Sequence, residues 1–125
     1  MSCIISTSDH PEDMWKLRNS DYDWFAELVM ARDRGDSELV AALERSKAIG
    51  LLPLDTIVRE NPRLAHALAN VLLAVAQEIA TGQLFPSELF WHVDSEDKEK
   101  YKSHFRPLVT LLTRFTQMTS SDSHG

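Results

Sequence analysis

The chain has 125 residues, of which 43% are apolar and 26% are charged, and its formal net charge at pH 7 is −6. This length is typical of one domain with one core, and an acidic chain is poorly suited to nucleic acid, because phosphate is recognised by clustered lysine and arginine. The sequence lacks signal-peptide features and any apolar run that could cross a bilayer, and Cys3 is its only cysteine. We therefore expect a cytoplasmic protein without disulfides that contacts neither nucleic acid nor a membrane.

The first third of the chain is predicted to consist of a loose end and two helices. Residues 1–8 show no regular pattern and are expected to be frayed. Pro11 favours a short helix over residues 11–19, because proline fits the first helical position. A longer helix is predicted from a cap at Ser20 to about Arg34, with a broad face of aromatic and aliphatic side chains.

Two further helical segments are predicted next. Asp36 is a suitable cap for a helix that Gly50 ends, and this helix should form a hairpin with the preceding one. Residues 51–60 are predicted to form about two helical turns, because a proline stands near the start and an acid lies in the first turn.

The central segment predicts one complete helix over residues 62–81. Asn61 can cap this helix, Pro62 fits its first position, and Gly82 suits the left-handed residue that follows its end. The polar residues occupy one sector about 120° wide, and the rest of the circumference is apolar. Such a helix needs neighbours on nearly every side.

The C-terminal third is predicted to contain a short helix, a long helix and a tail. Residues 85–92 are expected to form a lid on the core. The long helix carries one apolar stripe with spacings of four, three, four and three: Tyr101, Phe105, Leu108, Leu112 and Phe115. Pro107 lies inside this stripe, so we expect a kink or a break there. Residues 120–125 are predicted to be disordered.

The pattern as a whole favours an all-α fold. Strand signals are poor, because alternation of apolar and polar residues is nearly absent and no Asn-Gly or Asp-Gly turn occurs. We predict a compact bundle of roughly six or seven helices around the central helix 62–81, forming a single helical domain over residues 9–119.

No motif indicates a catalytic centre. The serines lie outside any nucleophile motif, and no metal-binding or phosphate-binding motif occurs, so we predict a protein that is not an enzyme and needs no cofactor or metal. An alternative hypothesis places a pocket between the central helix and the 85–92 lid. The residues that could hold a ligand there are His66, Glu88, Trp91 and His92.

The most distinctive predicted surface lies at the start of the second helix. Residues 1–38 carry nine acidic side chains against four basic ones. Within them, Asp21, Asp23, Trp24 and Glu27 form a predicted partner-binding site. Tryptophan is frequent at protein interfaces, and clustered carboxylates would attract a cationic protein.

These features favour a small acidic helical protein that acts by contact with a basic protein partner. One concrete version is an immunity or antitoxin-like protein that neutralises a cationic toxin, by analogy of size and charge. The first alternative is a ligand- or metal-binding enzyme or carrier that uses the pocket beside the lid. The second is a self-associating structural or regulatory subunit, a homodimer if the apolar helix is covered across a two-fold axis.

Overall fold

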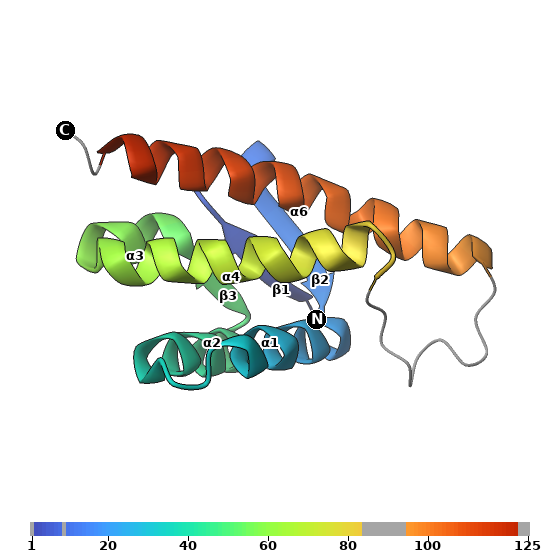
Figure 1. Ribbon diagram of the computed structural model, residues 1–125, viewed down its shortest axis with the longest axis horizontal. Helices are drawn as coiled ribbons and strands as arrows, with labels where there is room; N and C mark the ends of the chain where they lie inside the picture. The colour runs from blue at the N-terminus through green and yellow to red at the C-terminus, as the bar shows by residue number, and fades with distance from the viewer. Residues whose placement is uncertain (1, 9, 84–94, 123–125) are drawn as a thin grey trace.

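The computed structural model describes residues 2–8, 10–83 and 95–122 of the chain (Figure 1). Its elements are β1 (Ser2–Ser6), the 3-10 helix η1 (Pro11–Asp13), β2 (Met14–Arg18), α1 (Asn19–Arg32), α2 (Ser37–Ile49), β3 (Leu51–Pro53), α3 (Leu54–Glu60), α4 (Pro62–Ala80) and α6 (Ser95–Asp122). The predicted all-α bundle of six or seven helices is therefore wrong. In the described ranges the protein combines a mixed three-stranded sheet with five α-helices.

The sheet has the strand order β2-β1-β3, with the N-terminal strand in the middle. β1 runs antiparallel to β2, where Ile5 lies opposite Trp15, and parallel to β3, where Ile5 lies beside Leu52. Side chains alternate between the two faces of a strand, so these three residues share one face, and all three are buried. Met14 and Lys16 belong to the other face and are exposed. The core therefore lies on one side of the sheet.

Both longer strands replace elements that were predicted differently. In the segment 11–19, where a helix was expected, only Pro11–Asp13 forms a 3-10 turn before β2 begins. The alternation in β2 spans five residues, too few to stand out against the helix signal of the proline. Residues 1–8, where a frayed end was expected, contain the central strand. Pairing with residues distant in the sequence decides the structure of both segments.

Helices α1, α4 and α6 lie side by side in a layer in front of the sheet, with α4 in the middle (Figure 1). The central helix predicted from the sequence is confirmed, although α4 ends at Ala80, one residue early. The side chain of Asn61 accepts a hydrogen bond from the Leu64 amide at 3.2 Å, and Gly82 has a left-handed backbone with φ of 83°. Seven side chains of α4 are buried: Ala65, Leu68, Ala69, Leu72, Val75, Ala76 and Ile79.

Two neighbouring predictions have different outcomes. The helix between Asp36 and Gly50 is confirmed as α2, because the Asp36 carboxylate accepts a hydrogen bond from the Leu39 amide at 3.2 Å and Gly50 is left-handed. The predicted helix over 51–60 is shorter than expected. Its first three residues pair with β1 as β3, and α3 begins only at Leu54.

Helix α6 continues through Pro107, so of the two predicted alternatives, a kink or a break, the break is wrong. Pro107 and Ser103 are both exposed, and water can therefore solvate the Ser103 carbonyl that loses its helical donor. The stripe around the proline stays in register, and Phe105 and Leu108 are fully buried. Residues 120–122, where a disordered tail was expected, belong to this helix, whereas 123–125 and the 85–92 lid lie outside the described residues. Within the described part, no helix has the length and apolar character needed to cross a membrane.

Two hydrogen bonds join α6 to strand β2. The indole nitrogen of Trp15 donates to the carbonyl of His104 at 2.9 Å, and the Nε2 atom of His104 donates to the carbonyl of Lys16 at 2.8 Å. The Trp15 ring also packs against Phe105, with ring centroids 4.9 Å apart. The long helix is therefore fixed to the sheet as well as to α4.

A buried polar cluster connects β1, α1 and α2. The hydroxyl groups of Tyr22 and Ser46 lie 2.7 Å apart, and Ser46 donates to the Leu43 carbonyl at 2.6 Å. The Cys3 thiol donates to the Ser46 carbonyl at 3.7 Å. Burial raises the pKa of the Cys3 thiol to about 11, although a hydrogen bond with Tyr22 partly offsets this effect. The cluster is satisfied internally, and its residues hold three elements in register.

Candidate functional site

The first candidate site is an acidic face formed by Asp23 and Glu27 of α1 and Glu44 of α2. All three side chains are exposed. Lys47 of α2 lies among them and bonds to Glu27, with 3.0 Å between its Nζ atom and the carboxylate oxygen. This hydrogen bond raises the pKa of Lys47, and the negative charges of Glu27, Glu44 and Asp23 act in the same direction. Glu27 therefore pairs directly with Lys47, and Asp23 and Glu44 add negative charge to the same face.

The local fold of α1 explains which side chains reach this face. Tyr22 and Phe25 point into the core and are buried, so Asp23 and Glu27, one turn apart, are left on the outside. Trp24 lies between the two sets and is half-buried. The three aromatic rings of the segment therefore do not all point into the core.

Asp21 does not belong to the exposed surface that the sequence suggested. Its side chain is only 6% exposed and accepts a hydrogen bond from the Nε atom of Arg18 at 3.3 Å. A partner could not reach this carboxylate without opening the start of α1. Sequence analysis also missed Glu44 and Lys47, because they come from a different helix and only the packing of α1 against α2 brings them to the face.

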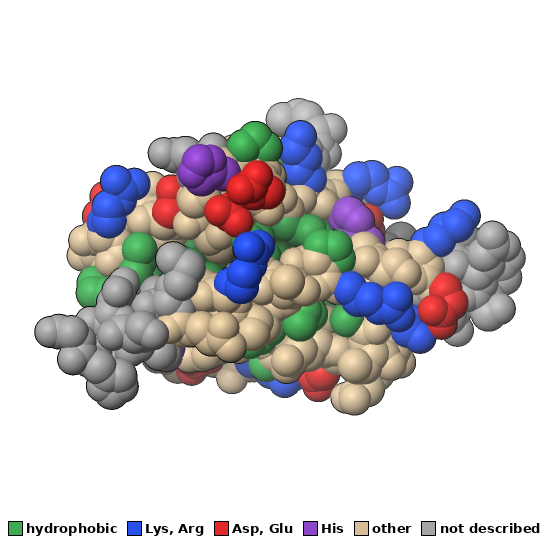
Figure 2. Space-filling view, turned by 90° about the horizontal axis from the view of Figure 1, so that it is seen from above, with side chains coloured by type: hydrophobic (Ala, Val, Ile, Leu, Met, Phe, Trp, Pro, Cys, Tyr) green, Lys and Arg blue, Asp and Glu red, His purple; other side chains and the backbone are tan. Residues whose placement is uncertain are grey.

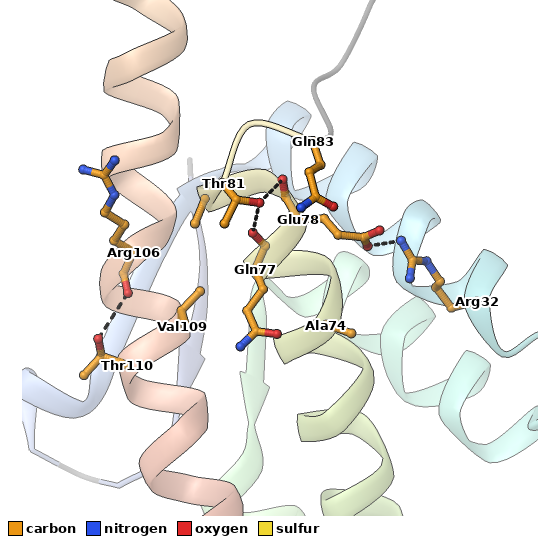
Figure 3. A pocket seen from close by; sticks show the side chains of 10 residues that line it. Arg32, Ala74, Gln77, Glu78, Thr81, Gln83, Arg106, Val109 and Thr110 are labelled. Atoms are coloured by element: carbon orange, nitrogen blue, oxygen red, sulfur yellow. Dashed lines mark hydrogen bonds and ion pairs between the residues drawn. The ribbon is translucent and has the colours of Figure 1, made fainter.

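The second candidate site is a groove between α4 and α6 that extends to the end of α1 (Figure 3). It has a volume of about 730 Å³. Its lining residues are Arg32, Ala74, Gln77, Glu78, Ala80, Thr81, Gln83, Arg106, Val109 and Thr110. Small and apolar side chains of both long helices form part of the lining, and amides, hydroxyls and charged groups form the rest.

The polar groups of this groove differ in how they are engaged. The Arg32 guanidinium is paired with the Glu78 carboxylate on one side. Thr81 donates to the Gln77 carbonyl at 2.8 Å, and Thr110 donates to the Arg106 carbonyl at 3.3 Å, so both hydroxyl protons are used by their own helices. Each hydroxyl oxygen keeps lone pairs that can accept a further hydrogen bond.

Of the four residues predicted to line a pocket, only His66 lies in the described part of the chain. His66 lies eight residues before Ala74, about 12 Å along the helix, and does not line the groove. Glu88, Trp91 and His92 lie outside the described residues. The actual lining residues Gln77, Glu78 and Thr81 stand in the polar sector of the central helix, which the sequence indicated as a solvent strip. The space beside these residues depends on where α6 packs, and no local sequence pattern indicates that position.

In the ranges 2–8, 10–83 and 95–122, no group of three or more His, Cys, Asp or Glu side chains is placed to hold a metal ion. Comparison with known proteins gives no further guide, because no protein-family model, no curated protein and no solved structure matches this chain. The candidate sites are therefore judged by their geometry and charge.

Proposed function

We propose that the protein is a cytoplasmic binding module whose acidic face docks on a basic protein. The observation that carries this proposal is a group of three exposed carboxylates whose charges all act on Lys47. Among them, Glu27 alone is in salt-bridge distance of a cation in the described part of the chain. Asp23 and Glu44 keep negative charges that a partner can neutralise.

Electrostatic complementarity supports this mode of action. Uncompensated surface charge speeds the association of oppositely charged proteins and discriminates against acidic competitors. Trp24 is half-buried three residues before Glu27, which makes the two side chains neighbours on the helix surface. Its ring adds apolar area next to the carboxylates, as is typical of anchoring residues at interfaces. This is a proposal for binding rather than catalysis, and a cationic toxin is one partner of the required class.

The test is a charge reversal on the acidic face with a matched control. Asp23→Lys combined with Glu44→Lys changes the charge by the same amount as Glu12→Lys combined with Glu60→Lys, and all four positions are exposed. Wild type and both variants are immobilised and exposed to lysate of the native cell, and the retained protein is then purified. We expect a basic protein that binds wild type and control but associates at least about tenfold more slowly with the face variant.

Salt dependence tests whether the charges of the acidic face drive the association. The association rate with wild type should fall steeply between low and physiological ionic strength, and this dependence should be flatter for the face variant. Circular dichroism verifies that both variants are folded. Equal binding of the retained protein to all three forms, or retention of an acidic protein, would contradict the proposal.

A further inference from the structure

The groove between α4 and α6 has the size of a small-molecule site. Its volume of about 730 Å³ lies within the range of roughly 300–1,000 Å³ typical of such sites. The space exists because α4 presents Ala74 and Ala80 and α6 presents Val109 at this level, and these side chains are too short to fill the distance between two helices. Deeper in the same interface, Leu72 and Leu108 are fully buried. The groove is therefore a surface site above a packed core.

The free hydrogen-bonding groups of the groove include amide donors that can meet an anion. Gln77 of α4 and Gln83, in the turn after it, contribute side-chain amides, and neither amide belongs to a side-chain hydrogen bond found within the described residues. Thr81 and Thr110 already use their protons. An entering ligand would thus be held at its polar end by amide N–H groups and by the charged residues of the walls.

The balance of charge decides the sign of the ligand. Arg32 is paired with Glu78 across one wall, and Lys102, whose ammonium group lies beside Gly82, is paired with Glu99 at 2.7 Å. Arg106 on the opposite wall donates to the Ser103 hydroxyl at 3.3 Å, and no carboxylate of the described chain lies within salt-bridge distance of it.

Lys100 and Lys102 lie one to two turns before this arginine on α6, and the one carboxylate described there, Glu99, is paired with Lys102 and also feels the charge of Arg106. Figure 2, which looks onto the α6 side, shows several lysine and arginine side chains, with fewer acidic ones among them, towards the end of the molecule where α6 begins. An anionic group would therefore be attracted to this side of the groove, whereas a cation would be repelled by the guanidinium of Arg106.

We infer that this groove binds a small organic anion with an apolar body. The apolar part lies against Ala74 and Val109, the amide of Gln77 orients it, and the anionic group bonds to Arg106. In Figure 3 the Arg106 side chain stands on α6 with its guanidinium pointing away from Gln77 and Thr81, so this group has to reorient to meet a ligand in the groove. Its long flexible arm lets the guanidinium turn from Ser103 to the ligand, where it makes a charge-assisted bond. This site is separate from the acidic face and does not depend on the partner proposed for it.

The experiment uses two probes with the same aromatic body and different charge. The anionic probe is 8-anilinonaphthalene-1-sulfonate, and the uncharged probe is N-phenyl-1-naphthylamine. Binding to the full chain is measured by fluorescence titration, and amide NMR spectra locate the bound probe. We expect saturable binding of the anionic probe, tighter than that of the neutral one, with shifts concentrated at Ala74, Gln77, Thr81, Val109 and Thr110.

Three variants test the assignment. Arg106→Gln should lower the affinity for the anionic probe about fivefold, which is the effect of losing one partly exposed ion pair. The affinity for the neutral probe should stay unchanged. Lys100→Gln makes the same charge change on an exposed position of the same helix outside the groove, and should leave both probes unchanged. Ala74→Phe should lower the affinity for both probes, because the larger side chain fills the groove. Shifts located elsewhere, or equal losses in Arg106→Gln and Lys100→Gln, would overturn the inference.

Discussion

The helical pair α4–α6 and the three-stranded sheet share one core but are held together in different ways. Apart from the Ser103 carbonyl, which lacks a donor at Pro107, each long helix satisfies its interior backbone hydrogen bonds within its own segment and adds a stripe of buried side chains. The strands have three to five residues and depend on partners that lie far away in the sequence. Ile5, for example, needs both Trp15 and Leu52 beside it. Short strands of this kind are not stable alone, so the sheet persists only with the helices that cover its inner face.

The first prediction asks whether the sheet is as firmly part of the core as the helices are. Ile5→Ala should lower the free energy of unfolding by about 2–5 kcal/mol, similar to Leu72→Ala, because both side chains are fully buried and each change leaves a cavity. Urea denaturation measures both. Ile49→Ala, at a position 61% exposed, is the control and should change stability by less than about 0.5 kcal/mol. If Ile5→Ala behaves like the control, the N-terminal strand is loosely attached.

The second prediction concerns the one irregularity in the helical pair. Pro107→Ala should raise the free energy of unfolding by about 1–3 kcal/mol, because it restores an amide donor for the Ser103 carbonyl and removes a steric clash in the helix interior. Thermal and urea unfolding measure the gain. Pro62→Ala is the matched control, since Pro62 stands at the start of α4, where proline is favourable, and there no gain is expected. Equal effects of the two changes would count against a helix that runs through Pro107.

The third prediction concerns the polar cluster that joins the sheet to α1 and α2. Burial raises the pKa of Cys3 from 9.0 to about 11, so the folded state favours the neutral thiol. The resulting stabilisation is complete below pH 9 and is lost as the pH rises towards 11, because the unfolded chain ionises first. At pH 10 the loss should be about 1 kcal/mol.

Urea unfolding of wild type and Cys3→Ala at pH 8 and pH 10, under reducing conditions, measures this effect. Cys3→Ala should be less stable than wild type at pH 8, but it should lose less stability between the two pH values. Parallel losses in both proteins would show that Cys3 is accessible to water in the folded state.

The parts of the fold that the sequence predicts are those with local signals. Asn61 and Gly82 mark the ends of α4, and Asp36 and Gly50 mark those of α2, because caps and left-handed glycines act on the backbone next to them. The sheet has no such marker. Its register depends on which segments meet in space, and the proline at residue 11 suggested a helix where β2 begins three residues later.

The candidate sites follow the same division. The exposure of Asp23 and Glu27 could be predicted, because their position follows from the helical period of α1. The burial of Asp21 could not, since it depends on the end of β2 and the side chain of Arg18. The groove was hidden for a similar reason: Gln77 faces a space that exists only because α6 lies beside α4.

The link between α6 and β2 has a consequence for the behaviour of the protein in concentrated solution. Strand β2 lies at the border of the sheet, and such a border can recruit a strand from another molecule and start aggregation. The amide of Ile4 bonds to Gly50 on the far side of β1, so the Lys16 carbonyl opposite it is turned outward, and the His104 imidazole occupies it. A strand from another molecule therefore finds the Lys16 carbonyl already bonded to the His104 imidazole. This contact disfavours intermolecular β-pairing at that point of β2.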